Sequence, residues 1–151
     1  MVEVGQEAPD FSLPDQNRNP WRLSEHRGEK LVLVFFPFAF SSVCGQEMCA
    51  LRDERKMFES EGASVIGICC DSVHAIKAWS DQNGFDFPIL ADRWPLGEVS
   101  KLYGAFDESI GAARRVSVVI GQDGRVVKVV ESPDIKTPRD SSEYHSALQG
   151  T

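Results

Sequence analysis

Two cysteines, Cys44 and Cys49, stand in the stretch FFPFAFSSVCGQEMC at residues 35–49. An apolar run precedes Cys44 and a charged pattern with helical spacing follows it, so Cys44 is expected in the first turn of a helix. Free backbone N–H groups and the positive end of the helix dipole favour a thiolate there, and the thiolate is the nucleophilic form. Ser41 and Ser42 are plausible N-caps. The pattern therefore indicates a reactive thiol at Cys44.

The second thiol, Cys49, stands five residues after Cys44. On an intact helix this spacing gives about 7.5 Å of rise and roughly 140° of rotation, so the two side chains point apart. A disulfide needs Cα atoms within roughly 7 Å and converging Cβ atoms. The two cysteines can form a disulfide only if the first turns of the helix unwind. Otherwise Cys49 fills a core together with Met48 and Leu51.

The elements that position these cysteines follow from the hydrophobic pattern. Continuous apolar runs predict buried strands at residues 31–36, 64–70 and 87–90. Helical spacing predicts helices at 43–61, 73–83 and 96–103, with a weak one at 143–148. VSVVI and RVVKVV flank the turn GQDG and predict a β-hairpin over 116–130.

This order of elements requires parallel pairing through crossovers first and antiparallel pairing at the hairpin. The prediction is an α/β protein with a thioredoxin-like fold, in which helices flank both faces of a mixed central β-sheet. The length of 151 residues fits a single domain over 1–151. Chemistry in such a sheet gathers at the carboxyl ends of its strands, which is where Cys44 falls.

The composition of the chain indicates which binding partners and which cellular location to expect. The net charge of −7 disfavours nucleic acid and anionic membranes. The longest apolar run, LVLVFFPFAF, is too short to span a bilayer, and the N-terminal residues lack a signal-peptide pattern, so a cytoplasmic location is expected. Thiols stay reduced in that compartment unless they work as redox groups. The four cysteines are therefore expected to be catalytic, metal-binding or buried rather than a disulfide framework.

The stretch PFAFSSVC at residues 37–44 resembles the peroxiredoxin signature of Pro, three residues, Thr or Ser, two residues and the peroxidatic Cys. Nearly the whole chain shares the resemblance, through GQEAPDFSLPDQN, LVLVFFP, FPILAD, LYGAF and RRVSVVIGQDG. The chain is similar to AhpE-like peroxiredoxins. Its FSSVCGQEMC spacing also resembles the PrxQ or bacterioferritin-comigratory group, in which the second cysteine resolves the first. The chain departs from the family pattern at two positions. Ser41 stands where Thr is more usual, and Gly121 stands where the family commonly has Asp.

The resemblance implies a thiol-dependent peroxidase that reduces hydrogen peroxide and organic hydroperoxides. Cys44 would attack the peroxide, Pro37 would shield the thiolate, and Ser41 would hydrogen-bond the peroxide oxygens. Arg115 would hold the thiolate and stabilise charge on the leaving oxygen. Neighbours on a strand point to opposite faces, so either Arg115 or the adjacent Arg114 can reach the site, but not both. Glu47 would orient Arg115 or line the pocket, unless it is a solvated helix residue.

The resemblance also implies that Cys44 becomes a sulfenic acid, which Cys49 would resolve as a disulfide. Alternatively, the protein is a one-cysteine peroxidase recycled by an external thiol, or a redox sensor that uses the same oxidation. The expected reductant is a thioredoxin, a mycoredoxin or a low-molecular-weight thiol. Apolar residues lie in loop-like segments at Trp94 to Leu96 and at Phe106, and such exposed loops often mark interfaces. The resemblance to AhpE-like proteins implies a homodimer, whereas the resemblance to the PrxQ group implies a monomer, and both alternatives stay open.

The remaining candidates are weaker. Cys69 and Cys70, inside a predicted strand, are expected to be buried hydrophobes. The cysteine spacings are poor for a zinc site, and no cofactor or metal is expected. The three histidines, at positions 26, 74 and 145, are predicted to be separate surface residues.

Overall fold

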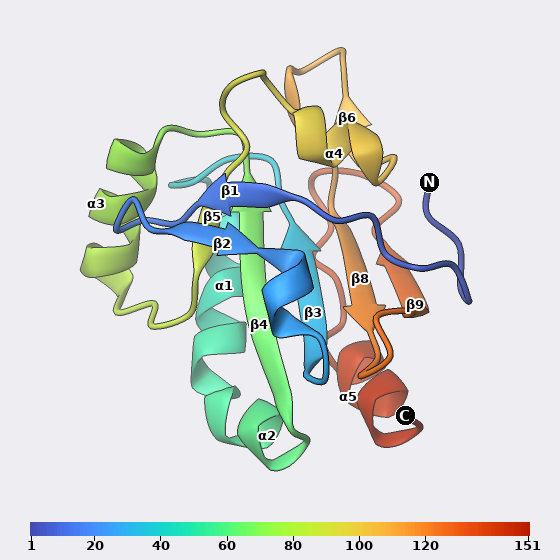
Figure 1. Ribbon diagram of the computed structural model, residues 1–151. Helices are drawn as coiled ribbons and strands as arrows, with labels where there is room; N and C mark the ends of the chain where they lie inside the picture. Colours follow the sequence, from blue (N-terminus) through green and yellow to red (C-terminus); the bar gives the residue numbers. More distant parts are fainter.

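The computed structural model describes residues 1–151 and is built on a five-stranded sheet of order β5-β4-β3-β8-β9 (Figure 1). Its strands are β3 (Lys30–Phe35), β4 (Ala63–Cys69), β5 (Ile89–Ala91), β8 (Val116–Ile120) and β9 (Val126–Glu131). β3, β4 and β5 are parallel, whereas β8 and β9 run antiparallel to their neighbours. The predicted mixed sheet and hairpin are therefore confirmed.

The two faces of the sheet are covered differently. One face packs against the helices α1 (Ser42–Asp53), α2 (Arg55–Ser60), α3 (Val73–Asn83) and α5 (Ser142–Gln149). The other face packs against β1 (Ser12–Pro14), β2 (Pro20–Arg22), the 3₁₀ helix at Leu23–His26 and α4 (Glu98–Leu102). Helices thus lie on both faces, as predicted, but the longer ones share a single face.

The sequence of the central strand β3 does not alternate between apolar and polar residues, because both faces of this strand pack into a core. Val32 and Val34 enter the core beneath the helices, while Leu31, Leu33 and Phe35 enter the core on the opposite face. All five residues are buried, so both sides of the strand must be apolar.

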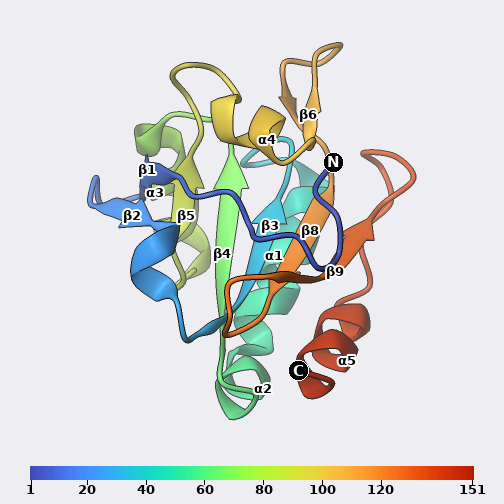
Figure 2. The same cartoon turned by 45° about the vertical axis from the view of Figure 1, so that its right-hand side comes forward.

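The N-terminal segment runs across the sheet to its far edge, as the second view shows (Figure 2). There the backbone N–H of Gly5 donates to the carbonyl of Val126 at 2.8 Å, and that of Val126 donates to Gln6 at 2.9 Å. A small extra sheet, formed by β6 (Phe106–Asp107) and β7 (Ala112–Ala113), was not predicted because two-residue strands leave no periodicity to detect. None of the helices has the length and apolar character needed to cross a membrane.

The helix predicted over 43–61 is two helices, because it is interrupted at Glu54. The backbone of Glu54 leaves the helical region, with φ −92° and ψ 11°. Its carboxylate accepts hydrogen bonds from Ser141 Oγ and pairs with His145 of α5. These are contacts with a distant segment, which the periodicity of 43–61 does not report.

Strand pairing brings distant residues to one edge of the sheet. Phe35 at the end of β3 is paired with Val116 at the start of β8. The residue before β8, Arg115, therefore lies beside the connection that leads from β3 to α1. This is how the fold joins two parts of the predicted site.

Candidate active site

Cys44 lies in the first turn of α1 and is completely buried. Ser41 is the N-cap, and its Oγ accepts a hydrogen bond from the backbone N of Cys44 at 3.4 Å. The Ser41 carbonyl accepts a second bond from Gly45 N at 2.9 Å. The sulfur thus stands at the positive end of α1, where a thiolate is favoured electrostatically.

Arg115 supplies a fixed positive charge to this sulfur. Its Nη1 donates to Cys44 Sγ at 3.1 Å and to Glu47 Oε1 at 2.7 Å. Its Nε donates to the carbonyl of Ile135 at 2.8 Å, and only 3% of its surface is exposed. Arg115 is therefore held from two sides with one nitrogen directed at the thiol.

The neighbouring arginine points elsewhere. Arg114, two residues before β8, pairs with Glu131 at the end of β9 and donates to the carbonyl of Gly104 at 2.5 Å. Of the two adjacent arginines, only Arg115 contacts Cys44.

The side chain of a second arginine, Arg139, is also buried, and no sequence pattern predicted it. Its backbone N and Nε donate to Glu47 Oε2 at 2.7 and 2.9 Å, and its Nη2 donates to Oε1 at 2.9 Å. Its Nη1 donates to the carbonyl of Phe35 at 2.6 Å. Arg139 lies in a polar segment after Pro138, where no local pattern distinguishes it from a solvated residue.

Glu47 is thus a buried carboxylate between two guanidinium groups rather than a solvated helix residue. Burial alone opposes its ionisation, but the hydrogen bonds and charge of Arg139, with the charge of Arg115, outweigh burial and lower the pKa of Glu47. The carboxylate stays ionised and fixes Arg115 against the sulfur.

The other motif residues lie in the connection between β3 and α1. Pro37 is buried two residues after the end of β3, and Ser41 is half-buried at the helix start. Beside the site, Arg115 and Ile135 help to line an open hollow of about 590 Å³. Its other walls come from Asp107 of β6, from Arg114, and from the end of β9 with the segment that follows it.

Cys49 lies on the same continuous helix as Cys44 and is half-buried. Its Sγ faces α3, where Asn83 Oδ1 lies 4.0 Å away. Arg52 also binds this end of α3, since its Nη1 donates to the Asn83 carbonyl at 2.6 Å. All four cysteines are free thiols in this conformation.

Cys69 and Cys70 are both buried at the end of β4. Burial, reinforced by the charge of Asp71, raises the pKa of Cys69 well above its ordinary value. Burial and the charge of Asp92 raise the pKa of Cys70 to about 11. Both surroundings disfavour a thiolate, in contrast to the helix start that holds Cys44.

The prediction that all three histidines are surface residues is wrong for His145, which is only 5% exposed. Its Nδ1 lies 2.6 Å from Glu61 Oε1 and its Nε2 lies 2.8 Å from Glu54 Oε1. Two carboxylates from the α1–α2 segment make this burial possible, since they satisfy both ring nitrogens. His74 is exposed and His26 half-buried.

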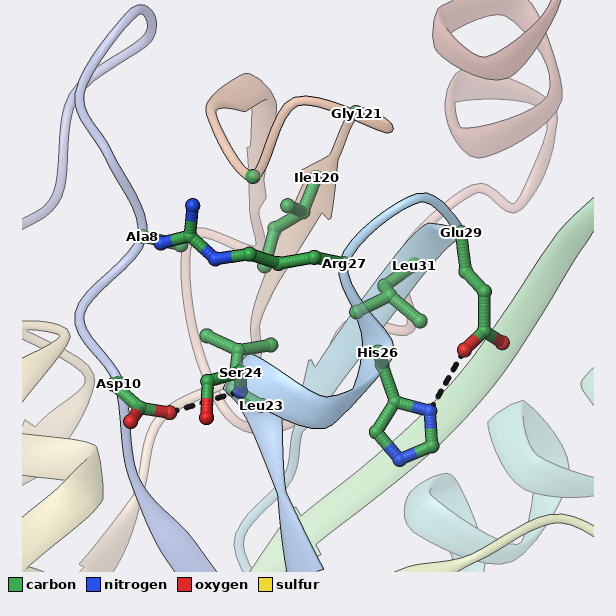
Figure 3. A pocket seen from close by; sticks show the side chains of 11 residues that line it. Ala8, Asp10, Leu23, Ser24, His26, Arg27, Glu29, Leu31, Ile120 and Gly121 are labelled. Atoms are coloured by element: carbon green, nitrogen blue, oxygen red, sulfur yellow. Dashed lines mark hydrogen bonds and ion pairs between the residues drawn. The ribbon is translucent and has the colours of Figure 1, made fainter.

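A separate small cavity lies between the N-terminal segment, the 3₁₀ helix and the β8–β9 turn (Figure 3). It measures about 20 Å³, which is room for about one water molecule. Ser24 N donates to Asp10 at 2.9 Å on one side, and His26 pairs with Glu29 at 2.9 Å on the other. No cysteine lines this cavity, so it is not part of the thiol site.

Known proteins resemble the chain in sequence and in fold. Residues 4–129 match the AhpC/TSA family. Alkyl hydroperoxide reductase E of Mycobacterium tuberculosis is 39% identical over 149 residues, which are 98% of this chain and 97% of that protein. Peroxiredoxin Bcp of Escherichia coli is 28% identical over 153 residues, with 97% and 93% coverage.

Among solved structures, peroxidoxin BcpB of Mycobacterium tuberculosis superimposes with a TM-score of 0.89 at 29% identity. The match covers 99% of this chain and 98% of that one. AhpC of the same organism, at 22% identity, shares the fold with a TM-score of 0.86. These matches confirm the thioredoxin-like fold and show that the chain belongs to the AhpC/TSA family and is a peroxiredoxin, a thiol-dependent peroxidase.

Proposed function

We propose that this peroxiredoxin reduces hydroperoxides through the thiolate of Cys44. The sulfur attacks one peroxide oxygen, the O–O bond breaks, and the electron pair leaves with the other oxygen, which takes a proton to become an alcohol or water. Cys44 is thereby oxidised to a sulfenic acid. The observation that carries the proposal is the 3.1 Å contact between Arg115 Nη1 and Cys44 Sγ at the start of α1.

The residues around Cys44 are suited to the transition state of that step. The guanidinium of Arg115 stabilises the thiolate beforehand and the negative charge that develops on the leaving oxygen. Glu47 keeps Arg115 in place, and the Ser41 hydroxyl is available to donate to a peroxide oxygen. Pro37 shields the thiolate from water.

We propose that Cys49 resolves the sulfenic acid. Its thiolate attacks the sulfur of Cys44, a disulfide forms, and the hydroxyl leaves as water with one proton from solvent. Because both residues lie on the intact α1, the first turns of this helix must unwind before the sulfurs can meet. A dithiol reductant such as a thioredoxin or mycoredoxin then reduces the disulfide and completes the cycle.

A one-cysteine cycle is the second candidate. The orientation of Cys49 toward Asn83 of α3 favours it, since the observed conformation directs the half-buried second thiol toward another helix. In that cycle a low-molecular-weight thiol condenses with the sulfenic acid, releasing water, and a second thiol reduces the mixed disulfide.

The substrate range and assembly are also proposals. The name of the 39% identical relative, alkyl hydroperoxide reductase E, supports organic hydroperoxides in addition to hydrogen peroxide. Pairing as a homodimer is supported by exposed apolar side chains, since Trp94 is 86% exposed and Leu102 is 50% exposed. A cytoplasmic location would supply the reducing thiols that either cycle needs.

Peroxide consumption by the wild type, Cys44→Ser and Cys49→Ser tests the proposal, with each protein supplied with a thioredoxin system or a small thiol. We expect Cys44→Ser to be inactive with both reductants. Loss of only the thioredoxin-driven turnover in Cys49→Ser supports the disulfide cycle. Full turnover of Cys49→Ser on a small thiol, with no thioredoxin-driven turnover even in the wild type, supports the one-cysteine cycle. Activity in Cys44→Ser would overturn the proposal.

A further inference from the structure

The connection Pro37–Phe40 carries the N-cap Ser41 and hence the start of α1. Phe40 has a φ of +68°, in the left-handed region that non-glycine residues rarely adopt. Such a conformation persists only where surrounding contacts determine it. Burial of apolar side chains is not enough to hold Phe40 in this conformation, because Phe38 is 41% exposed and Phe40 is 54% exposed.

The contacts that hold this connection come from the segment between β4 and α3. Asp71 Oδ2 accepts a hydrogen bond from the backbone N of Ala39 at 2.8 Å. Three residues earlier in each connection, the Ile68 carbonyl accepts from Phe36 N at 3.0 Å, which extends the β3–β4 pairing. One residue after Ala39, the Phe40 ring meets the Trp79 ring of α3, with centroids 6.3 Å apart.

The position of Asp71 is fixed by the start of α3. Asp71 directly precedes Ser72, the N-cap of α3, whose Oγ accepts from Ala75 N at 3.2 Å. β3 and β4 are parallel neighbours, so their carboxyl ends lie at the same edge of the sheet and the two connections run side by side there (Figure 1). The Ala39–Asp71 bond is the one side-chain hydrogen bond that joins them.

We propose that Asp71 is a positioning residue of the peroxidase site, whose carboxylate fixes the Pro37–Phe40 connection and thereby the Ser41 hydroxyl that meets the peroxide. The inference rests on the proposed peroxidase function of Cys44. Asp71 acts through the loop alone: Cys44 makes its own hydrogen bonds with Arg115 and Ser41, not with Asp71. Removing Asp71 therefore displaces the peroxide-binding groups without taking away the charge that stabilises the thiolate.

The test compares Asp71→Ala, Asp71→Asn and the control Asp81→Ala in single-turnover reactions. Asp81 is an exposed acidic residue on α3 whose partner is Lys77, so its loss leaves the connection intact. Two rates are measured at Cys44: oxidation by hydrogen peroxide, which needs the positioned loop, and alkylation by iodoacetamide, which needs only an accessible thiolate. A displacement of about 1 Å in such a site costs up to roughly a hundredfold in rate.

We expect Asp71→Ala to lower the peroxide rate constant roughly tenfold or more while its alkylation rate stays equal or rises. Asp71→Asn, which keeps an acceptor oxygen for Ala39 N, should recover most of the loss, and Asp81→Ala should match the wild type. Three outcomes would each overturn the inference. The first is an unchanged peroxide rate in Asp71→Ala, and the second is an equal loss of its peroxide and alkylation rates. The third is an Asp71→Asn variant that reacts with peroxide as slowly as Asp71→Ala. Failure of wild-type Cys44 to react with peroxide would instead refute the proposed function.

Discussion

Arg139 donates three hydrogen bonds to the carboxylate of Glu47, at 2.7, 2.9 and 2.9 Å, although 92 residues separate the two in sequence. Both side chains are nearly inaccessible to solvent, with 1% and 4% exposure. The segment before α5 thereby holds the group that orients Arg115 at Cys44. The site depends on a buried chain of alternating charges, not on the cysteine and the helix start alone.

Replacing Arg139 by Leu should destabilise the fold by about 3 kcal/mol, because it leaves the Glu47 carboxylate buried with only one arginine. Urea unfolding at neutral pH measures this loss. The double variant Glu47→Gln with Arg139→Leu should recover part of it, since the uncompensated charge is gone. A single variant as stable as the wild type would show that the ion pair contributes nothing to the fold.

The two adjacent arginines provide a matched pair of variants. Arg115→Ala should lower the rate of Cys44 oxidation by about a hundredfold or more, the usual cost of losing a donor to developing negative charge. Arg114→Ala should stay within about twofold of the wild type, because Arg114 faces Glu131 and does not contact Cys44. Stopped-flow measurement with hydrogen peroxide gives both rates, and similar losses in the two variants would contradict the assignment of Arg115.

Much of this site could be predicted from the sequence because its key residues belong to short patterns. The signature around Cys44 and the VSVVI strand that directly follows Arg115 are local, and the antiparallel pairing of β3 with β8 brings them to one edge. Arg139 and His145 could not be found in this way. Each is buried by carboxylates of the α1–α2 segment, so its environment exists only after α5 has packed against that segment. The break at Glu54 was missed for the same reason.

The burial of His145 predicts a pH-dependent stability. Burial opposes its protonation, but hydrogen bonds and charges from Glu61 and Glu54 outweigh burial and raise the pKa of His145 above its ordinary value of 6.5. Folding therefore favours the protonated ring. Its contribution to the free energy of unfolding is complete below pH 6.5 and is lost as the pH rises through the elevated folded pKa.

Urea unfolding of the wild type and His145→Gln between pH 6 and 9 measures that contribution. The charged groups that contact the His145 ring are Glu54 and Glu61. The difference in stability between the two proteins should shrink toward alkaline pH. A difference that grows with pH would mean that the folded protein favours the neutral ring.

Cys70 should remain unreactive under conditions in which Cys44 is modified. Its pKa is raised to about 11, so almost none of it is thiolate at neutral pH. Alkylation of the native protein followed by peptide mapping should label Cys44 first and Cys70 only at strongly alkaline pH. Early labelling of Cys70 would show that its burial is less complete than the structure indicates.

A mass-spectrometric peptide map after one equivalent of hydrogen peroxide identifies the cysteine that reduces peroxide. In the wild type, we predict a disulfide between Cys44 and Cys49, with Cys69 and Cys70 still reduced. In Cys49→Ser, we predict one added oxygen atom on Cys44. Oxidation of another cysteine while Cys44 remains a free thiol would contradict the assignment of Cys44 as the residue that reduces peroxide.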